Sequence, residues 1–205
     1  MDNLAQVNFL YPYLNINSDK ELLRGLLEAL KPHCPDLNKK ELKQAIACGR
    51  TAYDAYMSAI RQEGERALQF AKDNAKRVMI LAGRPYHIDP EIGHGIDKLA
   101  VSLGFVVVSE DSICHLAQTP TVHVLNQWTY HARLYRAAKF ATEHPNTELV
   151  QLVSFGCGVD AITTDEIRSI LEESGKYYTQ IKIDEITNLG AVRIRLRSLL
   201  GALEQ

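Results

Sequence analysis

Residues 1 to about 75 carry a helical pattern of hydrophobic positions and no convincing strand. After Asn38, apolar or small residues recur at intervals of three and four as far as Ala71, which marks one helix face over many turns. Asn38 and Glu41 have the spacing of a capping pair at its start. We therefore predict one helix of about 35 residues, roughly 50 Å long. Gly49 and Gly64 lie on its apolar face, where they either allow close packing or break the helix in two.

A shorter helix is expected before the long one, near Ser18 to Leu30, because Pro32 follows it. From Lys76 onward the pattern changes to short apolar runs that alternate with amphipathic stretches. The apolar runs predict four strands, with the sequences RVMILAG, FVVVSED, LVQLVSF and YYTQIKID. Helices are expected between and after them, at 95–104, at 126–144, from a capping box of Thr163 and Glu166 to Gly175, and at 189–203.

Continuous apolar strands that alternate with helices are typical of a parallel sheet covered on both faces. The predicted fold class is therefore α/β. We expect a four-stranded parallel, flavodoxin-like (Rossmann-like) three-layer domain at residues 76–205. A helical arm or cover at residues 1–75 precedes it.

Composition and charge exclude few classes but narrow the setting. The chain has 205 residues, 46% of them hydrophobic, and a formal net charge of −2, which gives no support to nucleic-acid or anionic-membrane binding. No apolar run approaches the ~20 residues that span a bilayer, and no secretory signal pattern opens the sequence. Four cysteines without a C-x-x-C pair do not form a disulfide scaffold. We expect a cytoplasmic, reducing location.

A loop rich in glycine and polar residues follows each predicted strand. Because the carboxyl ends of parallel strands open on one edge of a sheet, we expect these loops to converge on a functional site. The alternative is that their residues serve the turns alone. The loops contain Gly83, Arg84, His87 and Asp89 after the first strand, Glu110, Asp111 and Cys114 after the second, Gly156, Cys157 and Gly158 after the third, and Asp184 and Glu185 after the fourth.

The residues in these loops leave several roles open. His87 and Asp89 form an acid/base pair or tie down a turn that contains two prolines. Cys157 is a ligand, a nucleophile or an inert thiol, and its flanking glycines let a backbone or a cluster approach closely. As a nucleophile it would need His87 or His94 as its base. Cys114 is expected to be a small core residue. The sequence has no G-x-G-x-x-G motif and no P-loop, which argues against ordinary dinucleotide or ATP binding.

Five motifs in order carry a family resemblance: GRPYHIDPEIGHGI, EDSI, QWTYHARLYRAA, SFGCGVDAITTDEI and IKIDEITNLGAVRIRLRSL. Together they resemble the C-terminal region of acyl-CoA dehydratase activase-related proteins, from about Tyr11 to Leu200 and most densely after Lys76. Those proteins join ATPase modules, related to the activator of 2-hydroxyglutaryl-CoA dehydratase, to modules that resemble the dehydratase subunits. The chain is thus expected to correspond to a C-terminal portion of such a protein.

The resemblance implies a [4Fe–4S] or double-cubane cluster that passes one low-potential electron to a substrate or partner. Gly83, Glu110, Asp111 and Cys157 match features of the last flavodoxin-like domain of the dehydratase subunits. The metal ligand would be Cys157. Such a cluster needs several cysteines, so the other ligands would lie in preceding domains. The implied partners are upstream dehydratase-like and ATPase modules or a dehydratase subunit, together with acyl-CoA.

Three functions follow from these observations. The first is a dehydratase-like, electron-transfer module that contributes to an iron–sulfur site and is not active alone. The second is a module that binds CoA or a nucleotide phosphate, or docks another domain, on the rim formed by the loops after the strands. The third is a thiol-dependent acyl transferase that uses Cys157.

Overall fold

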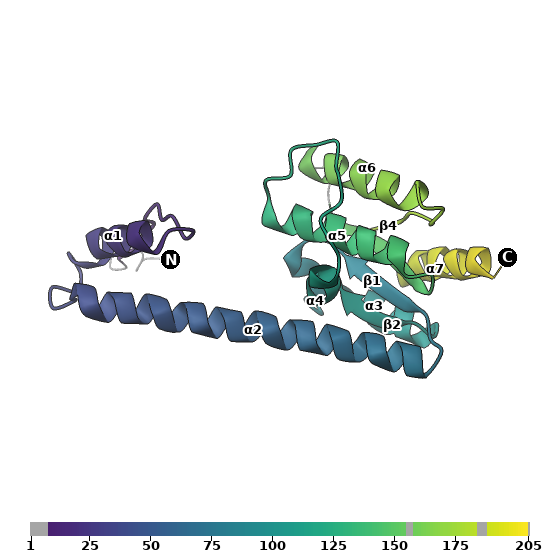
Figure 1. The fold of residues 1–205 in the computed structure, drawn as a ribbon, viewed down its shortest axis with the longest axis horizontal. Helices are drawn as coiled ribbons and strands as arrows, with labels where there is room; N and C mark the ends of the chain where they lie inside the picture. Colours follow the sequence, from purple (N-terminus) through teal and green to yellow (C-terminus); the bar gives the residue numbers. More distant parts are fainter. Residues whose placement is uncertain (1–7, 155–157, 184–187, 205) are drawn as a thin grey trace. The chain divides into compact units, whose positions relative to one another are not determined.

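The computed structural model describes residues 8–154, 158–183 and 188–204 (Figure 1). The chain forms two compact units, residues 1–58 and 59–205. The division falls inside helix α2 (Lys39–Asp73), whereas the sequence pattern placed the change from helical to alternating structure at residue 75. Within the described residues, no helix is long and apolar enough to cross a membrane.

The first unit contains α1 (Asp19–Leu30) and the beginning of α2. Ser18 caps α1 by accepting a hydrogen bond from the Glu21 amide at 3.4 Å, and the Asn38 side chain accepts one from the Glu41 amide at 3.0 Å. Arg50 pairs with Asp19 at 3.0 Å and so ties the two helices together. The predicted helix boundaries are confirmed, including a single α2 of 35 residues.

The second unit is built on a four-stranded sheet in which all strands are parallel, in the order β2-β1-β3-β4. Val78 at the start of β1 lies opposite Val106 of β2 and Thr147 of β3. This is a flavodoxin-like α/β arrangement, as predicted from the alternating pattern. The strands are β1 (Val78–Ala82), β2 (Val106–Ser109), β3 (Thr147–Val153) and β4 (Thr179–Lys182).

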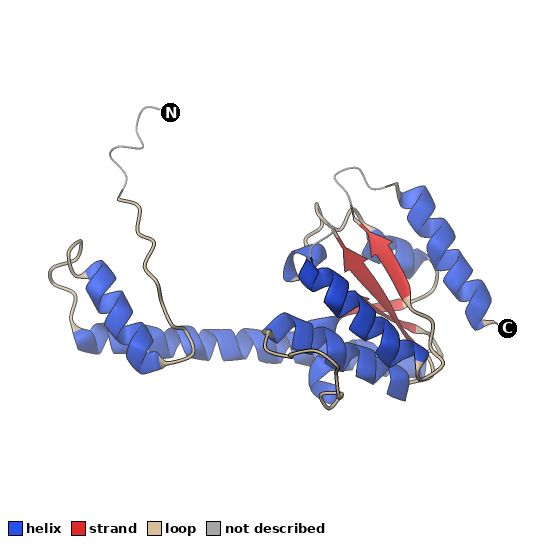
Figure 2. Cartoon of the chain, turned by 90° about the horizontal axis from the view of Figure 1, so that it is seen from above, coloured by secondary structure: helices blue, strands red, loops and turns tan. Residues whose placement is uncertain are grey.

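Helices cover both faces of the sheet (Figure 2). Alternate residues of β1 point to opposite faces: Met79 and Leu81 join the core under α3 and α7, whereas Ile80 joins the core under α5 and α6. The core under α5 and α6 also contains Ala71, which lies near the end of α2. The covering helices are α3 (Ile96–Ser102), α5 (Thr129–Glu143), α6 (Gly158–Glu172) and α7 (Leu189–Leu203).

Helix α6 begins at Gly158, so the expected capping box of Thr163 and Glu166 is wrong. Thr163 is buried inside the helix, where its hydroxyl donates to the Val159 carbonyl at 2.8 Å. The Glu166 carboxylate accepts the backbone amide of His123 at 2.7 Å. Thr163 and Glu166 have the spacing of a capping box but bond to other groups, and local spacing alone does not predict those partners.

Two short helices occupy the stretch after β2 that the sequence predicted as a loop. They are α4 (Glu110–Ile113) and the 3₁₀ turn η3 (Cys114–Leu116). The end of α2 lies against α4, since a Cβ at Gly64 would overlap the Ser112 carbonyl oxygen and lie 2.8 Å from its carbonyl carbon. Gly64 therefore permits a close helix contact, which is one of the two roles expected from the sequence. Gly49 has no such neighbour.

This difference between two glycines of one helix generates a paired prediction. Gly64→Ala should destabilise the chain by about 1–3 kcal/mol, because the backbone of α4 must move away from the new methyl group. Gly49→Ala should stabilise it by up to about 1 kcal/mol, because alanine is the better helix former and the site is open. Urea unfolding followed by circular dichroism measures both. Equal effects of the two substitutions would show that the close contact does not constrain the fold.

Candidate functional site

The carboxyl edge of the sheet brings together the loops that follow β1 and β3. The strand order reverses here, since β2 lies on one side of β1 and β3 lies on the other. In open α/β sheets this switch point is where ligands usually bind. The loop after β1 begins at Gly83 and contains the 3₁₀ turn η2 (Pro85–Ile88), and the described chain after β3 resumes with α6.

A bidentate ion pair joins the β1 loop to the first turn of α6. Arg84 Nε lies 3.1 Å and Arg84 Nη2 lies 2.7 Å from Asp160 Oδ1. The hydrogen bond to Asp160 raises the pKa of Arg84. Both side chains are mostly buried, so this pair is worth more than an exposed one. It fixes the spacing of the two elements that flank the switch point.

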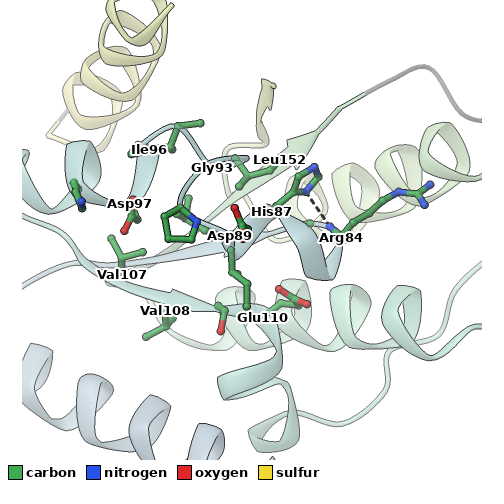
Figure 3. Close-up of a pocket in the computed structure, with 17 residues that line it drawn as sticks. Arg84, His87, Asp89, Gly93, Ile96, Asp97, Val107, Val108, Glu110 and Leu152 are labelled. Atoms are coloured by element: carbon green, nitrogen blue, oxygen red, sulfur yellow. Dashed lines mark hydrogen bonds between the residues drawn. The ribbon is translucent and has the colours of Figure 1, made fainter. Parts of the chain in front are cut away.

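His87 forms a second link, between the loop after β1 and the end of β3. Its Nδ1 accepts the backbone amide of Arg84 at 3.0 Å (Figure 3). Its Nε2 lies 2.8 Å from Ser154 Oγ. Because Nδ1 accepts, the proton of the neutral ring sits on Nε2 and is donated to Ser154. Burial lowers the pKa of His87, which keeps the ring neutral. A Cβ at Gly83 would overlap His87 Nδ1, so this glycine makes room for the ring.

These hydrogen bonds bear on the roles left open for His87 and Asp89. The lone pair of neutral His87 is already used by a backbone amide, which leaves it a donor and not a general base. Asp89 Oδ1 accepts the amides of Glu91 at 2.9 Å and Ile92 at 3.3 Å. Both side chains thus stabilise the turn, and the contacts are those expected of the turn-forming alternative.

Aromatic side chains surround the Arg84–Asp160 pair. The Arg84 guanidinium carbon lies 5.8 Å from the centre of the Tyr130 ring, and the tilted Tyr130 and His131 rings have centres 4.2 Å apart. Trp128 also contacts His131, at 5.1 Å between ring centres. The start of α5 therefore contributes aromatic side chains next to the ion pair.

A cavity of about 290 Å³ lies between the β1 loop and the end of β2 (Figure 3). Its walls include the apolar side chains of Leu81, Val107 and Leu152. Gly93 forms part of the floor, where a Cβ would lie only 3.0 Å from the His87 carbonyl oxygen. The polar and charged groups that line the cavity are Arg84, His87, Asp89, Asp97, Lys98, Ser109 and Glu110.

Glu110 is the most unusual of these groups because it carries a carboxyl group yet is only 4% exposed. Burial, with a further contribution from the neighbouring Asp111, raises its pKa to about 7. Arg133 Nη2 lies 3.4 Å from Glu110 Oε1 and opposes this rise. Burial also raises the pKa of Glu148 in β3, which has Lys176 at 3.2 Å and Arg77 at 3.9 Å from Oε1 but no hydrogen-bond partner for Oε2 among the described residues. The structure therefore holds a carboxyl group near its protonation midpoint at neutral pH.

The site residues expected from the sequence fall into three groups. Gly83, Arg84, His87, Asp89 and Glu110 line the cavity. The Asp111 carboxylate instead accepts the Ser109 hydroxyl at 2.6 Å, and Gly158 begins α6. Gly156 and Cys157 lie outside the described residues. The sequence did not single out Asp160 or Ser154, although their positions just before and after the G-C-G motif were a usable signal.

The described residues do not supply a ligand set for a metal cluster. No group of three or more His, Cys, Asp or Glu side chains is arranged to bind a metal ion anywhere in the described ranges. Cys114 is buried, and burial raises the pKa of its thiol, as expected of a small core residue. Cys34 and Cys48 are exposed and belong to the other unit.

The raised pKa of Glu110 predicts how stability depends on pH. Between pH 4.5 and about 7 the folded chain holds more protons at this carboxyl than the unfolded chain does. The free energy of unfolding contributed by this group is therefore full at low pH and falls as the pH rises through 7, by about 3 kcal/mol in total. Glu110→Gln should remove this fall, whereas Glu172→Gln, at an exposed position, should keep it. Urea unfolding at pH 5 and pH 8 tests it, and parallel behaviour of the two variants would contradict the assignment.

A family model described as the CoA enzyme activase uncharacterised domain matches residues 1–113. The match covers more than half of the 205 residues and includes the cavity residues from Gly83 to Glu110. Cys157 lies beyond it. Neither the curated proteins nor the solved structures gave a match to the chain. The chain belongs to the CoA enzyme activase-related family defined by this domain.

Proposed function

We propose that the chain is a dehydratase-like module of an anaerobic 2-hydroxyacyl-CoA dehydratase activase system. In this proposal the carboxyl edge of the sheet is the working surface, and Cys157 contributes one thiolate to an iron–sulfur cluster that other domains complete. The observation that carries it is the construction of the switch point, where Arg84–Asp160 and His87–Ser154 hold the elements on either side of the G-C-G motif together. Membership of the activase-related family supports the same role.

The position of Cys157 in the sequence adds a chemical argument. It directly precedes Gly158, with which the 15-residue helix α6 begins. Backbone amides at the start of a helix favour a thiolate over a thiol. A thiolate is the form that binds iron.

The distribution of the other cysteines explains why the cluster would be shared. Iron–sulfur clusters are held by several thiolates. Cys114 is kept as a thiol by burial, and Cys34 and Cys48 lie in the other unit. The remaining ligands are therefore assigned to partner modules. A bound cluster would supply one-electron chemistry, while Arg84, Asp160 and His87 would hold the edge of the sheet in place.

Iron content tests this proposal. The chain should be reconstituted with iron and sulfide under anaerobic conditions, alone and together with the ATPase and dehydratase-like modules. We expect the isolated chain to stay colourless, and the Cys157→Ala assembly to lose iron relative to the assembly with the unchanged chain. Cys48→Ala removes an exposed thiol from α2 and should leave the iron content unchanged. An iron-loaded Cys157→Ala assembly, or a stable cluster in the isolated chain, would refute the shared site.

The cavity at the end of β2 supports a second function, the binding of the acyl end of an acyl-CoA. Ligand sites usually measure about 300–1,000 Å³ and combine apolar walls with a few polar groups. At about 290 Å³ this cavity suits a short acyl thioester and is too small for a whole nucleotide. The lining has that mixed character, with Leu81, Val107 and Leu152 beside His87 and Glu110.

Calorimetric titration with acetyl-CoA tests the second function. Val107→Phe places a larger side chain in the cavity wall and should weaken binding at least about tenfold, a loss of about 1.4 kcal/mol. Val101→Phe makes the same change at an exposed position of α3 that does not line the cavity and should bind as the unchanged chain does. Equal binding by both variants would place any CoA site elsewhere.

A further inference from the structure

We infer that Glu110 determines the ligand class of the cavity: as a neutral carboxylic acid it donates a hydrogen bond to an uncharged carbonyl oxygen, such as that of a thioester or an amide. This inference rests on the proposal that the cavity binds an acyl group. It adds the atom that recognises the ligand and the protonation state in which recognition occurs.

The position of Glu110 follows from the end of β2. The strand finishes at Ser109 and α4 starts at the next residue, so Glu110 lines the cavity where β2 ends (Figure 3). Only 4% of the residue is exposed to solvent. The cavity therefore includes a carboxyl group that is largely shielded from bulk water.

The charges around Glu110 do not balance an ionised carboxylate. Arg133 from α5 approaches no closer than 3.4 Å, and Asp111 from α4 adds a like charge. On the other walls, Arg84 is already paired with Asp160. His87 is neutral and directs its proton to Ser154. The remaining charged or titratable neighbours among the described residues are Asp89 from the β1 loop, Asp97 and Lys98 from α3, Cys114 from η3, and Arg136 from α5, which acts on the same Cys114 thiol as Glu110 does.

A neutral carboxylic acid has one hydrogen to donate, and a ligand in the cavity can accept it. Donation to a ligand carbonyl satisfies both groups, whereas an ionised Glu110 would face the carbonyl oxygen as a second acceptor. Arg84 is paired with Asp160, and Lys98 is opposed by Asp89 and Asp97, so the lining has no net positive charge that would attract a ligand carboxylate. The arrangement therefore favours an uncharged acyl carbonyl over a free acid.

The inference predicts a specific dependence of affinity on pH. If only the protonated form binds, the apparent dissociation constant is the intrinsic one divided by the protonated fraction. With the pKa of Glu110 at about 7, the dissociation constant should rise about tenfold between pH 6 and pH 8. Glu110→Gln supplies an amide donor at every pH and should bind with the same affinity at both values.

Calorimetric titration with acetyl-CoA at pH 6 and pH 8 tests this prediction on the full chain. Glu172→Gln serves as the control and should show the full tenfold change. The phosphates of the ligand also titrate in this range, but they affect all variants alike, so the difference between Glu110→Gln and the control isolates Glu110. Free acetate should bind more weakly than acetyl-CoA.

The outcomes separate the inference from the function on which it rests. Binding that does not change with pH in the unchanged chain, or a pH response that Glu110→Gln retains, overturns the role of Glu110 alone. No binding of acetyl-CoA at either pH overturns the acyl site as well. If Glu110→Gln does not fold, the unchanged chain still gives an answer, because at pH 8 it should take up about one proton per ligand bound. Calorimetry in two buffers of different ionisation enthalpy measures that uptake, and zero uptake contradicts the inference.

Discussion

Helices cover both faces of the parallel sheet, and the two central strands β1 and β3 consequently have no solvent-exposed face. Polar groups at the ends of these strands must find partners within the fold or remain costly to bury. At the amino end of β3, Glu148 has Lys176 and Arg77 beside one carboxylate oxygen, and burial still raises its pKa. At the carboxyl edge, Arg84 and His87 have close partners in Asp160 and Ser154. Glu110 at the same edge has Arg133 at 3.4 Å, and burial outweighs this contact and raises the pKa of Glu110.

Burial raises the pKa of two carboxyl groups, Glu110 at the carboxyl edge of the sheet and Glu148 in β3, and Glu110 is the one that lines the cavity. Fully paired groups stabilise a fold without offering anything to a ligand. A buried carboxyl group that is kept neutral retains a hydrogen that can be donated to a ligand, and it lines a cavity here. The cavity lies at the carboxyl edge of the sheet, and the G-C-G motif follows β3 in the sequence, so the proposed acyl site and the proposed cluster site are compatible with one module.

The periodicity of the sequence was sufficient to predict the elements of the fold. The 35-residue helix repeats its signal over many turns, and the four strands stand out as short apolar runs that alternate with helices; the helix and the four parallel strands were confirmed. The start of α6 was not predictable, because Thr163 and Glu166 have the spacing of a cap but bond to Val159 and His123. Short α4 has too few residues to produce a periodic signal.

The site was predictable only in outline. In a parallel sheet the loops after the strands meet at one edge, so the sequence was sufficient to place five of the site residues there: Gly83, Arg84, His87, Asp89 and Glu110. Their partners depend on the register of β1 against β3, which local sequence does not encode. Asp160 and Ser154 were therefore missed. The protonation state of Glu110 depends on its burial and on its distance from Arg133, and neither can be predicted from the local sequence.

The central claim is that Glu110 is a carboxylic acid near neutral pH. Its direct test is a carbon-13 NMR titration of the glutamate side-chain carboxyls, with the Glu110 signal assigned from its absence in Glu110→Gln. The account predicts that this one signal titrates with a midpoint of about 7. A midpoint near the ordinary glutamate value of about 4.3 would contradict the account, because the cavity would then present a carboxylate to its ligand.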